Sequence, residues 1–258
     1  MSDSSDRLWH CIESGFCTGT QNMEQDIALA QRLQRGEIPP TLRLYGWKPW
    51  AVSLGYNQSE LDIDKDKCSE FGIEIVRRPT GGRAVLHANE LTYSIVMASG
   101  GKGITETYSM ISKALVAGLS KLCADVAYET SQPNFQAFYK KQESIPCFSA
   151  SARYEVQING KKLVGSAQRR FSSEQFPEIV LQHGSILLGK EHRLLAEILH
   201  VENNSIKEKI MNDIDNKTID LSSALGRIVT FEETTSIVRT GFEEAMNIHF
   251  EKTIEAVL

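Results

Sequence analysis

The chain has 258 residues, of which 41% are hydrophobic and 24% are charged, and its formal net charge at neutral pH is −5. Such a composition is typical of a soluble globular protein, and the length fits one large domain with a small appendage. Its apolar runs stay well short of the ~18–20 residues that cross a bilayer, and the negative charge argues against nucleic-acid binding, so we expect neither a membrane nor a nucleic acid as a partner.

The N-terminal residues are acidic and polar, without the basic start and apolar middle of a secretory signal. Five cysteines are spread along the chain at positions 11, 17, 68, 123 and 147, and they form no Cys-x-x-Cys pair. This pattern predicts neither a disulfide framework nor a metal site. We therefore expect a cytoplasmic protein without a bound metal.

Hydrophobic periodicity and turn residues predict a chain of alternating strands and helices. The expected elements, in chain order, are a helix at 22–35, strands at 41–45 and 51–54, a short helix at 62–71, strands at 72–76 and 91–97, a helix at 105–122, strands at 154–158, 162–164 and 178–181, and helices at 205–214 and 231–250. This order indicates an α+β fold. We expect a main domain over residues 1–190 and a small helical C-terminal segment over residues 191–258.

The segment RRPTGGRAVLH, residues 77–87, joins the strands expected at 72–76 and 91–97. Its adjacent glycines, Gly81 and Gly82, reach backbone angles closed to other residues and let a ligand approach the main chain. Exposed N–H groups beside arginines suit an acyl carbonyl or a phosphate. On this local pattern alone, an ordinary hairpin turn with solvated arginines is an equally good interpretation.

A second signal is the dipeptide Asn159-Gly160, the strongest short indication of a β-hairpin. Lys161 and Lys162 follow it, and taken alone they would be surface charges of that hairpin. The small residues Gly165-Ser-Ala come directly afterwards.

Four segments together resemble a known family: RRPTGGRAVLH at 77–87, ELTYS at 90–94, GKKLVGSAQ at 160–168 and LQHGSI at 181–186. In this order and spacing they are similar to the lipoate/octanoate attachment family. That family comprises the lipoate–protein ligases and the octanoyltransferases, and it shares its catalytic fold with the biotin–protein ligases. The resemblance runs from about residue 22 to residue 188 and implies a catalytic domain of mixed sheets flanked by helices.

Within the family, three features resemble the cysteine-dependent octanoyltransferases rather than the ligases. Arg83 stands where ligases usually carry a third glycine, and residues 88–91 replace the Asp-x-Gly-Asn run that is common in ligases. The pair Cys147-Phe148 matches the position of the transferases' nucleophilic cysteine. One departure is the sequence of residues 149–153, where the transferases often have Pro-Ser before the tyrosine.

The resemblance implies that Cys147 is the nucleophile and Lys162 a second catalytic residue. A thiol with a pKa of ~8.5 needs a nearby cation or base to react at neutral pH. Lys162 could stabilise the thiolate as an ammonium or accept a proton when neutral. The residues implied to bind the acyl substrate are Arg77, Arg78, Gly81, Gly82, Arg83, His87, Gly165, Ser166, Ala167, His183, Gly184 and Ser185. For His87 and His183 we favour a role as hydrogen-bonded residues of the site wall or of the core over a role as general bases.

The expected reaction moves octanoate from acyl carrier protein to Cys147 and then to a lysine of a lipoyl domain or of the glycine-cleavage H protein. No cofactor is expected for this route. Three alternatives stay open: a lipoate–protein ligase using ATP and magnesium, an amidotransferase between two lipoyl proteins, and a non-catalytic lipoate- or biotin-binding module. A mere binding module would need neither Cys147 nor Lys162, so the presence of both residues counts against it.

Overall fold

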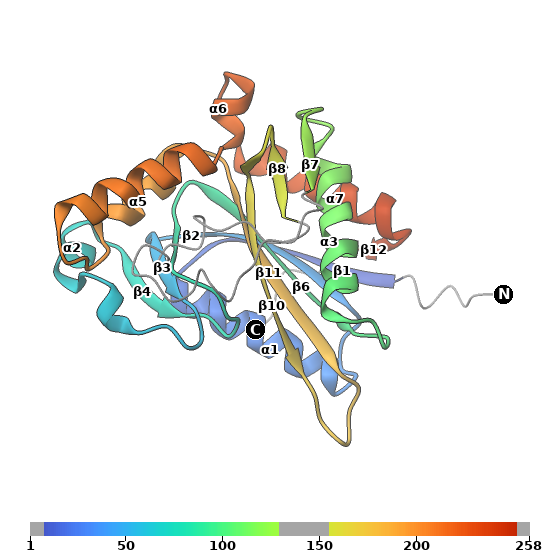
Figure 1. The fold of residues 1–258 in the computed structure, drawn as a ribbon. Helices are drawn as coiled ribbons and strands as arrows, with labels where there is room; N and C mark the ends of the chain where they lie inside the picture. Colours follow the sequence, from blue (N-terminus) through green and yellow to red (C-terminus); the bar gives the residue numbers. More distant parts are fainter. Residues whose placement is uncertain (1–7, 129–154, 252–258) are drawn as a thin grey trace.

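The computed structural model describes residues 8–128 and 155–251. Its centre is a mixed six-stranded sheet in the order β10-β11-β6-β2-β1-β12 (Figure 1). The strands are β1 (Leu8–Cys17), β2 (Thr41–Trp47), β6 (Glu90–Ala98), β10 (Val164–Phe171), β11 (Ile179–Leu187) and β12 (His249–Glu251). β1 runs parallel to both β2 and β12, whereas the β2–β6, β6–β11 and β11–β10 pairs are antiparallel.

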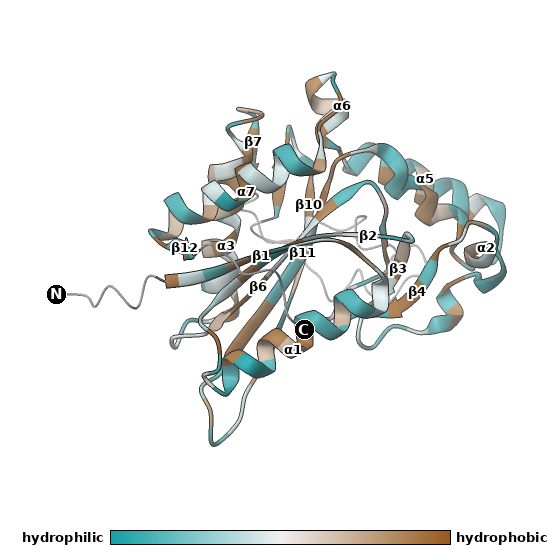
Figure 2. Cartoon of the chain, turned by 180° about the vertical axis from the view of Figure 1, so that it is seen from behind, coloured by the Kyte–Doolittle hydropathy of each residue, from teal (hydrophilic) through white to brown (hydrophobic). Residues whose placement is uncertain are grey.

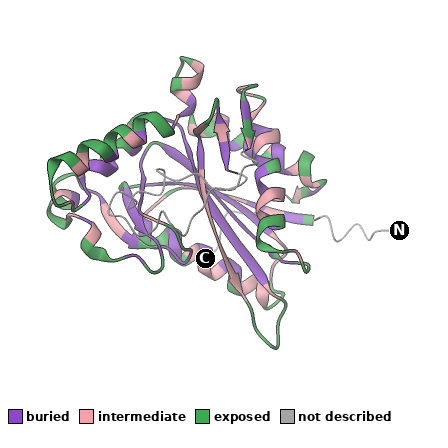
Figure 3. Cartoon of the chain, in the orientation of Figure 1, coloured by how far each residue is buried: buried purple, intermediate pink, exposed green. Residues whose placement is uncertain are grey.

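Helices cover both faces of this sheet. α1 (Gly19–Gln34) lies against one face, where Leu29 and Ala30 pack on Val96 of β6. α3 (Ile104–Leu119) and α7 (Phe231–Met246) lie together on the other face (Figure 1). Successive residues of β6 therefore point into different cores, as the two-residue repeat of a strand requires. The central strands are mostly buried, as Figure 3 shows, and apolar residues concentrate on them in Figure 2.

A smaller sheet has the order β4-β3-β5, formed by β3 (Ala51–Leu54), β4 (Glu74–Arg77) and β5 (Val85–His87). From the sequence, we expected the glycine loop to lead directly into the strand at 91–97. The chain instead forms β5 first, antiparallel to β3, and then enters β6 of the large sheet. The glycine loop, residues 78–84, therefore joins the two outer strands of the small sheet and lies where the two sheets meet.

A third sheet contains β7 (Val126–Tyr128), β8 (Val156–Ile158) and β9 (Lys161–Lys162). The predicted hairpin at Asn159-Gly160 is confirmed. Both residues have positive φ, 50° and 78°, as a two-residue type I′ turn requires.

The C-terminal part of the chain contains a 3₁₀ segment, η5 (Lys190–Glu197), and helices α5 (Asn204–Lys217) and α6 (Leu221–Leu225). η5 and α5 close a second core over β3, β5 and α2 (Lys65–Glu70). The helix expected at 231–250 ends earlier, because Asn247 is left-handed with φ 52°, and β12 follows it. Residues on both sides of position 190 share the two main hydrophobic cores.

A short 3₁₀ turn, η2 (Glu60–Asp62), completes the elements of the described ranges. None of the helices in these ranges combines the length and apolar character that a membrane crossing requires.

Candidate active site

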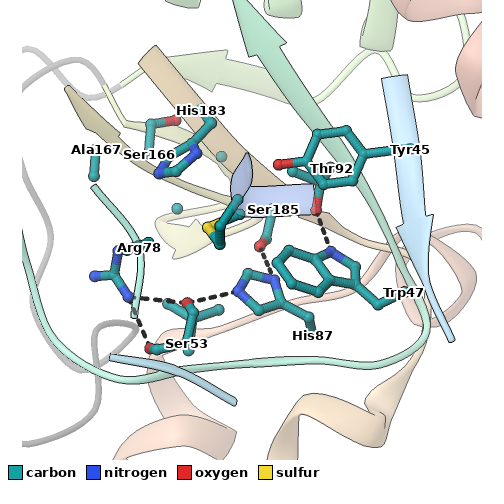
Figure 4. A pocket seen from close by; sticks show the side chains of 14 residues that line it. Tyr45, Trp47, Ser53, Arg78, His87, Thr92, Ser166, Ala167, His183 and Ser185 are labelled. Atoms are coloured by element: carbon teal, nitrogen blue, oxygen red, sulfur yellow. Dashed lines mark hydrogen bonds between the residues drawn. The ribbon is translucent and has the colours of Figure 1, made fainter. Parts of the chain in front are cut away.

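A cavity lies between the large and the small sheet, at the inner side of the glycine loop (Figure 4). Its lining residues are Met23, Tyr45, Trp47, Ser53, Arg78, Val85, His87, Thr92, Gly165, Ser166, Ala167, His183, Gly184 and Ser185. Aliphatic and aromatic side chains alternate there with hydroxyl, imidazole and guanidinium groups. A largely apolar cavity with a few fixed polar groups is the usual form of a small-ligand site.

Of the twelve residues that the resemblance implied to bind the acyl substrate, eight line this cavity: Arg78, His87, Gly165, Ser166, Ala167, His183, Gly184 and Ser185. The contributions of β10 and β11 face each other, because Ser166 pairs with Gly184 in the antiparallel register. A Cβ on Gly184 would lie 2.6 Å from both Gly165 O and Ser166 Oγ. Glycine at this position therefore allows β10 and β11 to approach closely beside the cavity.

The other four implied residues, Arg77, Gly81, Gly82 and Arg83, lie outside the cavity lining. Arg77 points toward the neighbouring turn and donates to the carbonyl oxygens of Gly55 and Gln58, at 2.9 and 2.7 Å. Gly81 and Gly82 are exposed at the outer side of the loop.

Gly82 has φ 99° and passes directly over Gly55. A Cβ on Gly55 would lie 2.1 Å from the Gly82 carbonyl oxygen. The glycine loop thus depends on Gly55, on the other side of the contact, which was not among the site residues expected from the sequence.

Arg78 holds the glycine loop from its inner side and is buried, with 4% of its surface exposed. Its Nη1 donates to Ser53 O at 2.8 Å and to Ser53 Oγ at 3.0 Å. Its Nη2 donates to Gly81 O at 2.9 Å and Arg83 O at 2.7 Å. The planar guanidinium, with its fixed set of donors, therefore fixes the shape of the loop as well as lining the cavity.

His87 is the centre of a hydrogen-bonded chain. Its Nε2 lies 2.7 Å from Ser53 Oγ, and its Nδ1 lies 2.9 Å from Glu90 Oε1. Its ring stacks on Trp47 with the centroids 3.9 Å apart. Burial lowers the pKa of His87 below its ordinary value, although the carboxylate of Glu90 acts in the opposite direction. The imidazole is therefore neutral at physiological pH.

A second chain contains His183 of β11 and Asp26 of α1, whose Nδ1 and Oδ2 atoms are 2.9 Å apart. The Nε2 of His183 lies 2.7 Å from Thr80 Oγ1 in the glycine loop. Asp26 also accepts from Arg43 Nη1 and Tyr45 OH, both at 3.0 Å. Burial alone would raise the pKa of Asp26, but the hydrogen bond from His183 and the charge of Arg43 lower it below its ordinary value.

Four residues of these two chains were not among the site residues expected from the sequence: Asp26, Ser53, Thr80 and Glu90. Glu90 stands inside the quoted segment ELTYS but was not chosen. Asp26 lies within the predicted first helix, and it is fully buried beside Met23 and Ala30. A carboxylate on the apolar face of an amphipathic helix is the signal that could have identified it.

Lys162 lies on β9, two residues before the start of β10, and is buried. Its Nζ is 2.5 Å from Glu155 Oε1, and both side chains are at most 5% exposed. The carboxylate compensates the charge of an ammonium group that is withdrawn from water. Cys147, the implied nucleophile, lies outside the described residues.

Residues 18–243 match the model of the lipoyl protein ligase A/B catalytic domain. The chain belongs to this family. Among curated members, it is 37% identical to a protein named octanoyltransferase LipM from Geobacillus kaustophilus, over 95% of this chain and 88% of that protein. A protein of the same name from Symbiobacterium thermophilum is 38% identical over 93% of this chain and 87% of that protein.

Solved structures of this family share the fold. A bipartite lipoate protein ligase from Thermoplasma acidophilum superposes with a TM-score of 0.74 at 24% identity, covering 97% of this chain and 87% of that one. The expected α+β fold of the lipoyl protein ligase family is thus confirmed. Within the ranges that the structure describes, no group of three or more His, Cys, Asp or Glu side chains is arranged to hold a metal ion.

Proposed function

We propose that this protein is an octanoyltransferase that carries the acyl group from acyl carrier protein to a lysine of a lipoyl-accepting protein. The observation that carries the proposal is the 37% identity, over 95% of the chain, to a protein named as an octanoyltransferase. Membership in the lipoyl protein ligase A/B family supports acyl attachment to a protein lysine as the reaction class. The acceptor we propose is a lipoyl domain or the glycine-cleavage H protein.

The cavity supports an acyl chain as the transferred group. Met23, Val85 and Ala167 offer apolar surface, and Trp47 with its stacked His87 closes one side. Gly184 lets β10 approach β11 closely, so that Gly165, Ser166 and Ala167 of β10 and His183, Gly184 and Ser185 of β11 line the same cavity. Each methylene that enters such a site contributes about 0.8 kcal/mol of favourable transfer free energy, so an eight-carbon chain gains most of its affinity here.

In the proposed route, the Cys147 thiol gives up its proton and the thiolate attacks the thioester carbonyl of octanoyl–acyl carrier protein; the carrier thiolate leaves and takes up that proton. A thioester is exchanged for a thioester, so this first step is close to neutral in free energy. The amine of the acceptor lysine then attacks the octanoyl–Cys147 thioester, and an amide forms while the thiol is released. The second step is strongly favourable, because an amide is much more stable than a thioester.

Lys162 is the second catalytic residue of the proposal. Glu155 holds its ammonium group in the protein interior. A fixed cation can stabilise a thiolate or the oxyanion that forms on the acyl carbonyl. Neither ATP nor a metal is required by this route, and the cytoplasmic location expected from the sequence forms part of the same proposal.

The test is intact-mass measurement of the purified protein after mixing with octanoyl–acyl carrier protein in the absence of ATP. We expect a gain of one octanoyl group that neutral hydroxylamine removes and that Cys147→Ala abolishes. The matched control is Cys123→Ala, because Cys123 is a free thiol away from the cavity. If no adduct forms and free lipoate is adenylated once ATP and magnesium are added, the protein is a ligase and the proposal is wrong.

A further inference from the structure

Three side chains on three different strands form a hydrogen-bonded line that ends in the cavity. Ser53 belongs to β3, His87 to β5 and Glu90 to β6. The distance from Ser53 Oγ to His87 Nε2 is 2.7 Å, and the distance from His87 Nδ1 to Glu90 Oε1 is 2.9 Å. A hydroxyl, an imidazole and a carboxylate in this order and at these distances have the geometry of a nucleophile, its base and the group that orients the base.

The protonation states follow from the surroundings of each group. The Thr92 and Ser185 hydroxyl groups donate to Oε1 of Glu90, the same oxygen that lies beside His87 Nδ1. Glu90 Oε1 therefore acts as an acceptor, and the neutral imidazole of His87 donates to it from Nδ1, which leaves the lone pair of Nε2 facing Ser53. Burial keeps the imidazole neutral at physiological pH. His87 can then accept a proton from the Ser53 hydroxyl.

The position of Ser53 is also suited to a reaction. Ser53 is buried from bulk solvent, but it lines the cavity, where it lies between Arg78 and His87 (Figure 4). Arg78 Nη1 lies 3.0 Å from Ser53 Oγ and places a permanent positive charge beside it. Such a charge stabilises the negative charge that develops on the oxygen as its proton leaves.

We propose that Ser53 is a second acyl-accepting nucleophile, which gives the protein a hydrolase activity toward medium-chain acyl thioesters and activated esters. This inference rests on the proposed function only in that an acyl chain enters the cavity. It is independent of Cys147, because the three groups that carry it lie on β3, β5 and β6.

The reaction consists of two balanced steps. Ser53 Oγ attacks the acyl carbonyl, its proton passes to His87 Nε2, and the same proton then leaves with the departing thiolate, so that an acyl–serine ester and a free thiol result. Water next attacks the ester and gives a proton to His87 Nε2. That proton returns to Ser53 Oγ as the ester bond breaks, and the carboxylic acid is released.

The experiment uses the full chain carrying Cys147→Ala, so that thiol acylation cannot contribute. A fluorophosphonate probe is added, and the labelled residue is mapped by peptide mass spectrometry. We expect labelling at Ser53, which Ser53→Ala removes. The control is Ser112→Ala on α3, another buried serine outside the cavity, which keeps the label.

Hydrolysis of p-nitrophenyl octanoate is measured on the same proteins. Ser53→Ala and His87→Gln are expected to lower the rate by about 100-fold or more, the usual contribution of a positioned base. Ser53→Cys keeps the volume of the side chain; it is expected to lose the fluorophosphonate label and to gain alkylation by iodoacetamide at position 53. This variant tests the reactivity of the site even if Ser53→Ala folds poorly.

The proposal is overturned if labelling and ester hydrolysis in Ser53→Ala equal those of the Cys147→Ala parent, or if Ser53→Cys is not alkylated. The two proposals fail separately. If no octanoyl adduct forms at Cys147 but the fluorophosphonate probe labels Ser53, the transferase route alone is contradicted. If the adduct forms at Cys147 but Ser53 is not labelled, the hydrolase activity alone is contradicted.

Discussion

His183 Nδ1 lies 2.9 Å from Asp26 Oδ2, and this contact joins β11 to α1 across 157 positions of the sequence. Both side chains are at most 5% exposed. The opposite nitrogen of His183 contacts Thr80 in the glycine loop. A single imidazole therefore ties the glycine loop to a carboxylate of α1, on the face of the large sheet that α1 covers.

The first prediction concerns this carboxylate. Asp26→Asn removes the charge that compensates Arg43, which is only 1% exposed, and we expect the free energy of unfolding to fall by about 3–5 kcal/mol. Urea denaturation followed by circular dichroism measures the change. As a control, Glu37→Gln breaks the surface pair with Arg35 and should leave the urea midpoint unchanged. An Asp26→Asn protein as stable as the parent would show that the buried pair has no net role.

A second prediction concerns pH. The pKa of His87 is lowered in the folded protein by burial, so between that pKa and the ordinary value of 6.5 the unfolded chain binds a proton that the folded chain does not. Stability must then fall as the pH drops below about 6.5, by at most ~1.4 kcal/mol per pH unit for each such histidine.

His87→Gln removes this contribution and should flatten the dependence of unfolding free energy on pH between 7 and 5. The pKa of His192 is lowered for the same reason, burial, so part of the slope is expected to remain. Urea melts at a series of pH values provide the measurement. A slope that His87→Gln leaves unchanged would contradict a neutral, buried His87 in the folded state.

The third prediction tests the close approach of β10 and β11. Gly184→Ala places a methyl group 2.6 Å from Gly165 O and Ser166 Oγ, so the strands must separate. Overpacking of this kind costs about 1–3 kcal/mol, and the displaced β10 backbone should narrow or distort the cavity. The melting temperature of Gly184→Ala is measured by differential scanning calorimetry. The control is Gly81→Ala, because a Cβ at Gly81 would meet no atom within 4 Å. Equal melting temperatures would contradict the packing argument.

The fourth prediction separates the structural and chemical contributions of Lys162. Lys162→Met leaves Glu155 buried without its cation and should destabilise the protein by about 3–5 kcal/mol. Adding Glu155→Leu removes the unpaired carboxylate, and stability should return toward that of the parent. If Lys162 is catalytic, the stable double variant still fails to form the acyl adduct in the intact-mass experiment. An active double variant would assign Lys162 a structural role alone.

The sequence could indicate much of the cavity lining because the motifs that carry the family resemblance are short and continuous. The run at 165–167 and the run at 183–185 were both assigned to the acyl site from the family resemblance, and the structure places them opposite each other on paired strands. The Asn159-Gly160 turn followed from the backbone angles that only a few residue types adopt readily.

Other features depend on contacts that no local pattern encodes. β12 is only three residues long, His249–Glu251, and pairs with Leu8–His10 at the start of β1, so it has no long hydrophobic alternation of its own. Ser53 is one residue of a short apolar strand, and its importance arises only because Arg78 and His87 reach it from elsewhere. Buried polar residues of this kind are identified by their partners, which the fold supplies.

The central claim is that the acyl group passes through an enzyme-bound thioester to a protein lysine without ATP. The most direct test is a single-turnover chase: octanoyl-enzyme freed of donor is mixed with a lipoyl domain in the absence of nucleotide, and both proteins are weighed by mass spectrometry. We predict that the octanoyl mass leaves the enzyme and appears on one lysine of the domain in equal amount. Retention on the enzyme, or transfer only when ATP is supplied, would contradict the account.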